Sequence, residues 1–181
     1  MVIAYHVVFT TYGTWLPNDP RGSYSKEIYN QQLWILGRIK YGRQDPTPAK
    51  ELLLRFWTAA TPHLGRPPFF IDDRSRFTIT TGFSRVVQRF GIKIGACAIM
   101  NDHVHILILR SKYRVEHIVN QLKGGATRAL KLKETPWTRG CWKVFISDNE
   151  TLLAAARYIQ ANSNCAGLPA QSWDFVTSMS V

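Results

Sequence analysis

The spacing of apolar and polar positions divides most of the chain into strands and helices. Short runs rich in β-branched and aromatic residues predict strands, and apolar residues three and four apart predict helices. Before residue 70 the pattern predicts one strand at 2–11 and one short helix at 49–60. After residue 70 it predicts helices at 74–90, 114–133 and 149–162 and strands at 92–100, 103–109 and 140–147.

Polar residues mark where two of these helices begin and where one ends. Asp72 or Asp73 can accept the unpaired N–H groups at the start of helix 74–90, and Asp148 can do so for the last helix. Gly91 fits the end of helix 74–90, because glycine tolerates the left-handed backbone that often closes a helix.

The order of elements predicts the fold class. Strand, helix, strand, strand, helix, strand and helix form a split β-α-β pattern. This indicates an α+β, ferredoxin-like sandwich with an antiparallel sheet of four or five strands and an extra C-terminal helix. We expect one domain over residues 1–168, with an insertion at about 24–68 that has little regular pattern, and an irregular tail over 169–181.

Charge points to a polyanionic partner. The 181 residues include 23 Lys and Arg against 12 Asp and Glu, a formal net charge of +11. Each phosphate that such a surface neutralises releases a counterion, which favours binding to nucleic acid; ordinary solubility charge is the alternative. The candidate DNA-binding residues are Lys123, Arg128 and Lys131 on the second long helix, Arg85 and Arg89 on the first, and Trp15 as a platform for an unpaired base.

Other features of the composition exclude several classes. Cys97, Cys141 and Cys165 lie far apart, which argues against a disulfide framework or a zinc knuckle. The chain has no run of ~18 apolar residues and no pattern typical of a signal peptide. We therefore expect a cytoplasmic, nucleoid-associated bacterial protein that does not enter a membrane.

Two histidines supply the sharpest local pattern, Asn101-Asp102-His103-Val104-His105. Alternate side chains of a strand share a face, so His103 and His105 project together and could hold one divalent cation. The alternative is two imidazoles that only form hydrogen bonds within the sheet. Asp102 could orient one imidazole or simply form the turn.

The last helix offers a third ligand and a nucleophile. Tyr158 and Asn162 lie four residues apart and so share one helical face. An amide oxygen suits Mg²⁺ or Mn²⁺, and neutral imidazoles suit Mn²⁺. Tyr158 could attack a phosphate held there, although an aromatic side chain in the core is the alternative reading. The other histidines, His6, His63 and His117, have no partner that the sequence identifies.

Both segments resemble one superfamily. Residues 100–107 resemble the His-hydrophobic-His motif of the HUH single-strand endonucleases, and residues 156–162 resemble the tyrosine helix of their single-tyrosine transposases. These are the insertion-sequence 200/605 type and the REP-associated tyrosine transposases. Residues 5–16 resemble the first strand and loop of the REP-associated branch. The chain departs after Asn162, where the proline and arginine usual in that branch are missing.

The resemblance implies a metal-dependent endonuclease and strand transferase acting on hairpin-bearing or palindromic single-stranded DNA. Tyr158 would be the nucleophile that forms a 5′-phosphotyrosine link, and His103, His105 and Asn162 would bind Mg²⁺ or Mn²⁺. A homodimer and a monomer, with the tyrosine acting in its own subunit or a neighbour's, both stay open. The alternatives are a non-catalytic, ferredoxin-like protein that binds single-stranded nucleic acid and, more remotely, a metal-dependent hydrolase of small phosphoesters.

Overall fold

The computed structural model describes residues 1–46 and 48–177. The chain divides into two compact units, one made of Met1–Thr10 with Phe70–Val181 and the other of Thr11–Phe69. We call them the sheet unit and the loop unit. The predicted insertion of residues 24–68 lies within the loop unit, and the assignment of domains stays a prediction.

The sheet unit contains one four-stranded antiparallel sheet. Its strands are β1 (Ala4–Thr10), β2 (Ile94–Ile99), β3 (His103–Leu109) and β4 (Trp142–Ile146), in the order β2-β3-β1-β4. This order is that of a split β-α-β fold, in which each helical crossover leaves room for a strand between the two that it joins. The predicted α+β, ferredoxin-like class is confirmed.

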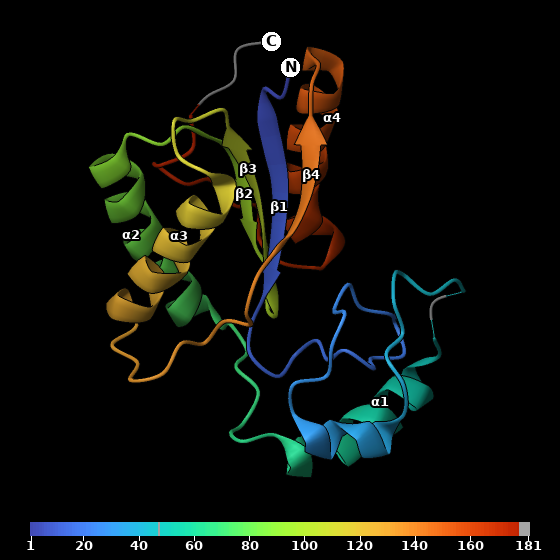
Figure 1. The fold of residues 1–181 in the computed structure, drawn as a ribbon. Coiled ribbons are helices and arrows are strands. Elements are labelled where there is room, and N and C mark those ends of the chain that lie inside the picture. Colours follow the sequence, from blue (N-terminus) through green and yellow to red (C-terminus); the bar gives the residue numbers. More distant parts are fainter. Residues whose placement is uncertain (47, 178–181) are drawn as a thin grey trace. The chain divides into compact units, whose positions relative to one another are not determined.

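Three helices pack on this sheet. Helices α2 (Asp73–Phe90) and α3 (Val115–Ala129) cover one face, and α4 (Asn149–Cys165) covers the other (Figure 1). Leu107 of β3 packs in a buried cluster with Ala156 and Ile159 of α4. Since side chains alternate along a strand, the positions two and four residues before Leu107 also face the α4 side of the sheet.

The predicted helix starts are confirmed by their caps. Asp72 accepts a hydrogen bond from the backbone N–H of Ser75, and Asp148 accepts one from Thr151. These bonds satisfy N–H groups that have no partner within the helix. Gly91 closes α2 in the left-handed conformation, with φ of 60°.

Two predicted helix ends were wrong. Helix α3 ends at Ala129, four residues earlier than expected, and Lys131 beyond it has a left-handed backbone with φ of 55°. Helix α4 runs to Cys165, three residues further than expected. The residue after Asn162 is Ser163 rather than a proline, so its N–H can continue the helical hydrogen bonds.

Helices α2 and α3 meet at two glycines. A Cβ atom added to Gly82 would lie 2.7 Å from the carbonyl oxygen of Gly125, and one added to Gly125 would lie 2.9 Å from that of Gly82. No larger residue fits both positions at this helix separation. Gly125, the second glycine of the pair at 124–125, therefore allows the two helices to pack closely.

The C-terminal segment lies along the outer edge of β2. The Gln171 side chain accepts a hydrogen bond from the Ile99 N–H at 2.8 Å and donates one to the Ile99 carbonyl at 2.9 Å. Further along, Thr177 donates its N–H to the carbonyl of Ile94. The predicted irregular tail thus has no helix or strand of its own over its described residues, but it satisfies groups on an otherwise open sheet edge.

The loop unit contains the predicted helix, α1 (Lys50–Ala60), and two short 3₁₀ helices that were not predicted, η1 (Gln31–Leu36) and η2 (Thr61–His63). Its small core consists of Leu16, Ile28, Leu33, Phe56 and Ala60. All three cysteines of the chain are free thiols. Within the described residues, no helix combines the length and the apolar character that a membrane crossing needs.

Candidate active site

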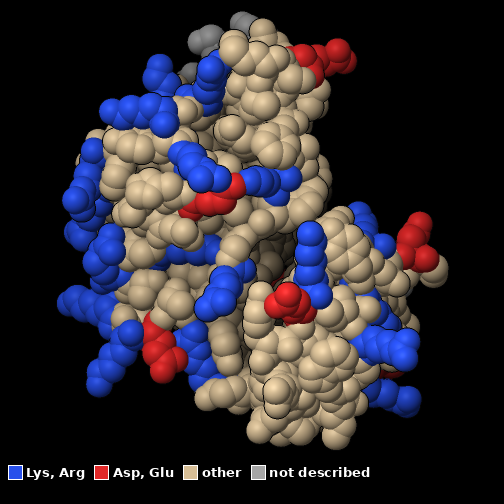
Figure 2. Space-filling model, viewed as in Figure 1, with Lys and Arg blue, Asp and Glu red and all other residues tan. Residues whose placement is uncertain are grey.

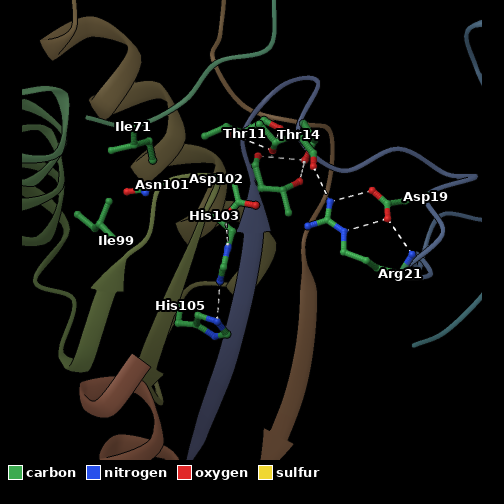
Figure 3. Close-up of polar contacts among 12 residues, drawn as sticks. Thr11, Thr14, Asp19, Arg21, Ile71, Ile99, Asn101, Asp102, His103 and His105 are labelled. Atoms are coloured by element: carbon green, nitrogen blue, oxygen red, sulfur yellow. Dashed lines mark hydrogen bonds and ion pairs between the residues drawn. The ribbon is translucent and has the colours of Figure 1, made fainter. Parts of the chain in front are cut away.

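Strand β3 presents the two predicted histidines on one face of the sheet. His103 and His105 lie opposite Thr10 and Val8 of β1, at the start of β3 (Figure 3). Their Nε2 atoms are 3.0 Å apart, and their ring centroids are 4.8 Å apart. The period of two along the strand therefore brings both imidazoles together, as predicted from the sequence.

Asp102 orients the first of these imidazoles. Its carboxylate oxygen Oδ1 lies 2.6 Å from Nδ1 of His103. A carboxylate only accepts hydrogen bonds, so Nδ1 of His103 carries the proton and donates it. In the neutral ring, Nε2 of His103 is then an acceptor, and it is directed at His105.

The turn that carries Asp102 is held by a buried arginine. Arg76 of α2 donates from Nε to the carbonyl of Ile99 at 2.9 Å and from Nη2 to Oδ1 of Asn101 at 2.7 Å. Arg76 also pairs with Asp73. The fixed fork of a guanidinium can hold several oxygens at once, so Arg76 fastens the β2–β3 turn to α2.

A third histidine, His6 of β1, belongs to the same cluster, and sequence reasoning missed it. Its Nε2 lies 3.0 Å from Nδ1 of His105 in a buried contact. His6 shares a face with Ala4 and Val8, so alternation alone could have placed it on the α4 side of the sheet. The register between β1 and β3, which brings His6 to His105, is not written in either segment.

The environment keeps His105 neutral. Burial, followed by the charges of His103 and His6, lowers the pKa of His105 to about 3. Burial also lowers the pKa of His6. Near neutral pH His105 is therefore an uncharged imidazole, the form in which histidine binds a metal.

Helix α4 places Tyr158 beside these rings. Ala156 and Ile159 on one side of the helix are buried against the sheet, whereas the side chain of Tyr158 is 55% exposed. The Tyr158 ring centroid lies 5.7 Å from that of His105 and 5.8 Å from that of His6. Tyr158 is thus accessible to a ligand and adjacent to the histidines.

Asn162 lies one turn after Tyr158 and is half-buried. Its amide Nδ2 donates a hydrogen bond to the Tyr158 carbonyl at 2.7 Å, which leaves the amide oxygen as the acceptor end of the side chain. Among the described residues, no three His, Cys, Asp or Glu side chains converge in a way that could hold a metal ion. A third protein ligand at the His pair would therefore have to be a group such as this amide.

The three predicted DNA-binding arginines lie together. Arg85 and Arg89 of α2 and Arg128 of α3 line a pocket of about 190 Å³, together with Phe90 and Gln121. Lys and Arg side chains gather along this side of the sheet unit (Figure 2). The other predicted contact of this group, Lys131, follows the end of α3.

Two other predicted DNA contacts are engaged within the protein. Lys123 is only 7% exposed, and its ammonium donates to the carbonyl oxygens of Thr138, at 2.8 Å, and Gly140. The prediction overlooked that a lysine on a basic helix can point inward and satisfy loop carbonyls. In the loop unit, Trp15 donates its N–H to the Gly22 carbonyl at 2.7 Å, and the Arg21 guanidinium lies 4.0 Å from the centroid of its ring.

Comparisons with known proteins decide the family. Residues 66–162, which include the His pair, Tyr158 and Asn162, match the family model described as "Transposase IS200 like". The chain belongs to this family. The expected transposase assignment is thereby confirmed at the level of the family, which is one of DNA-cleaving enzymes.

One solved structure shares the fold of this IS200-like transposase. A REP-associated tyrosine transposase bound to a REP hairpin is 13% identical, with a TM-score of 0.53, over 96% of this chain and 74% of that chain. The similarity at this identity shows the fold. A protein of Deinococcus radiodurans assigned as a transposase is 12% identical, with a TM-score of 0.43, over 88% of this chain and 89% of that chain. No curated protein matches the chain.

Proposed function

We propose that this IS200-like transposase cleaves and rejoins hairpin-bearing single-stranded DNA through Tyr158, with a divalent cation at His103 and His105. The observation that carries the proposal is the adjacency of three side chains from two distant segments. The exposed Tyr158 ring lies 5.7 Å from His105, whose Nε2 is 3.0 Å from that of His103.

The separation of the two donor nitrogens supports a divalent cation at this site. Two ligands at right angles in an octahedral site, each about 2.1 Å from the ion, are roughly 3.0 Å apart. The two Nε2 atoms have that separation. Two neutral imidazoles and the amide oxygen of Asn162 would suit Mn²⁺ or Mg²⁺ and would leave positions for a phosphate oxygen and water. A cation bound there would polarise the scissile phosphate and stabilise the charge on the leaving oxygen.

The chain's own residues then account for the reaction. The phenol oxygen of Tyr158 forms a bond to phosphorus, and the bond from phosphorus to the 3′-oxygen of the preceding nucleotide breaks. The phenol proton leaves to solvent, which is accessible at this exposed side chain, and the departing 3′-oxygen takes up a proton from solvent to become a 3′-hydroxyl. The 3′-hydroxyl of a second strand reverses these steps, so the phosphodiester count is unchanged and no energy cofactor is consumed.

The structure favours action within one chain, because Tyr158 already lies beside its own His pair. Mixing His103→Ala chains with Tyr158→Phe chains tests this. We expect the mixture to stay inactive, because neither variant contains a complete site. Recovery of cleavage in the mixture would instead mean that Tyr158 serves the neighbouring subunit.

The proposed DNA contacts are the arginines around the pocket between α2 and α3, with Lys131. Arg85, Arg89 and Arg128 line one small pocket, so they could contact neighbouring phosphates of one strand. A solved member of this fold was bound to a REP hairpin. That observation concerns the other protein, and it supports a hairpin as the first DNA to test here.

Covalent trapping separates this function from that of a non-catalytic binder of single-stranded nucleic acid. The chain is incubated with hairpin-bearing single-stranded DNA and Mn²⁺ and then run on a denaturing gel. We expect an adduct that survives denaturation and disappears in Tyr158→Phe. Tyr5→Phe is the matched control, because Tyr5 packs against Phe145 rather than against the His pair. An adduct that persists in Tyr158→Phe excludes Tyr158 as the nucleophile, and DNA binding without any adduct favours the non-catalytic alternative.

A further inference from the structure

His6 is a buried histidine that the proposed reaction does not use. It lies diagonally across from His105 on one face of the sheet, because Val8 of the same strand pairs opposite His105. Its Nε2 is 3.0 Å from Nδ1 of His105, and its ring also meets those of Trp142 and Tyr158 at centroid distances of 5.9 and 5.8 Å. A buried imidazole at the centre of the site needs an explanation of its own.

In both imidazoles of the His pair, Nδ1 has a polar partner. His103 directs Nδ1 to Asp102, and His105 directs Nδ1 to His6. Both rings therefore have a polar partner at Nδ1, and their Nε2 atoms lie 3.0 Å apart. In metal sites, a partner at the far nitrogen fixes the orientation and the tautomer of a ligating histidine.

The positions of the protons decide whether such a pair can bind a cation. Without a cation, the hydrogen bond between the two Nε2 atoms requires one of them to carry a proton, and His105 is the donor because His103 holds its proton at Nδ1. With a cation, both Nε2 atoms must offer lone pairs. The proton of His105 must then sit on Nδ1, where it needs an acceptor.

We propose that His6 is a positioning residue for the metal site. Its Nε2 accepts the proton of Nδ1 of His105 and so holds His105 in the tautomer whose Nε2 binds a divalent cation. The inference rests on the proposed function, since it assumes that His103 and His105 are the ligands. The protons balance, because His105 moves its proton from Nε2 to Nδ1 while His6 moves its own from Nε2 to Nδ1.

Mn²⁺ binding, followed by electron paramagnetic resonance, tests this role without measuring DNA cleavage. Loss of a partner to a ligating histidine usually weakens metal affinity by about 10–100-fold, and we expect a loss in this range for His6→Phe. We expect His6→Gln to bind within a few-fold of the parent, because its amide oxygen can accept the same proton. His117→Phe is the matched control, because His117 lies on α3 and contacts Phe90 and Tyr113.

The outcomes separate this inference from the proposed function. If the parent chain does not bind Mn²⁺, or if His103→Ala binds it equally well, the metal site itself is wrong and the role of His6 falls with it. If the parent binds Mn²⁺, His103→Ala does not, and His6→Phe matches the parent, the role of His6 alone is refuted.

A second measurement covers the case in which His6→Phe does not fold. Long-range proton–nitrogen NMR spectra of the parent chain report which ring nitrogen of His105 carries the proton. We expect Nε2 without metal and Nδ1 with Zn²⁺, a diamagnetic probe. A His105 that keeps its proton on Nε2 when Zn²⁺ binds would overturn the inference.

Discussion

The crossing of α2 and α3 allows a sharp prediction from two neighbouring glycines. Gly124 and Gly125 follow each other on α3, but only Gly125 faces α2. A Cβ atom at Gly125 would lie 2.6 Å from Cγ2 of Val86 and 2.9 Å from the carbonyl oxygen of Gly82. A Cβ atom at Gly124 would meet only the end of the exposed Arg128 side chain, at 3.3 Å.

These distances set the expected energies. Carbon atoms in contact prefer separations of about 3.5–4.0 Å, so Gly125→Ala has a shortfall of roughly 1 Å against a neighbouring helix. Overpacking of this kind costs about 1–3 kcal/mol, and the better helix propensity of alanine returns about 0.5–1 kcal/mol. We expect Gly125→Ala to lower the free energy of unfolding by about 1–2 kcal/mol. Gly124→Ala should raise it by up to about 1 kcal/mol, because the Arg128 side chain can move aside.

Urea unfolding followed by far-ultraviolet circular dichroism compares the two variants with the parent chain. Gly125→Ala should cost less stability when it is added to Val86→Ala than when it is added to the parent chain, because Val86→Ala removes the contact with Cγ2. Part of the loss should remain, because the Gly82 carbonyl still lies too close. Equal stability of Gly124→Ala and Gly125→Ala would refute the packing argument. The glycine at 125 would then need another explanation, such as the close approach of a phosphate.

Three further predictions concern buried and exposed cations. Burial lowers the pKa of Lys123 to about 8 from 10.5, so between these values the unfolded chain binds more protons and stability rises with pH. Between pH 7 and 9.5 the free energy of unfolding of the parent chain, measured in urea, should rise by up to about 2 kcal/mol relative to that of Lys123→Met. The rise is smaller to the extent that the carbonyl partners favour the charged ammonium. Parallel pH profiles of the two chains would contradict this prediction. Arg76→Leu should cost about 1.5–3 kcal/mol in the same assay, because the buried Ile99 carbonyl loses a charged donor and Asn101 loses its bond to α2. The exposed Arg74→Leu should change stability by less than about 0.5 kcal/mol. Fluorescence anisotropy without metal can measure how the affinity for hairpin DNA depends on salt. Arg89→Gln should reduce the slope of log affinity against log salt by about 0.7–0.9, whereas Lys123→Met should leave the slope unchanged. The reverse result would place the phosphate contact at Lys123.

Much of the fold could be predicted from local patterns. The limits of β3 follow from a run of alternating and apolar residues, and the starts of α2 and α4 follow from Asp72 and Asp148, whose caps involve residues only three positions away. The ends of α3 and α4 were predicted less accurately, because several residues beyond Ala129 and Asn162 permit the helix either to continue or to end. Lys131 and Gly167 adopt left-handed backbone conformations just after the ends of α3 and α4, and such a conformation cannot continue a helix.

Within the site, the sequence by itself determined which groups are separated by short, fixed distances. His103 and His105 share a face because a strand repeats every two residues, and Tyr158 and Asn162 share one because a helix nearly repeats every four. Only the tertiary structure decided which of these groups meet. His6 reaches His105 across 99 positions of sequence through the register of β1 on β3, and Lys123 turns inward to carbonyls of the segment before β4. Register and burial depend on how distant segments pack, and no local period encodes that.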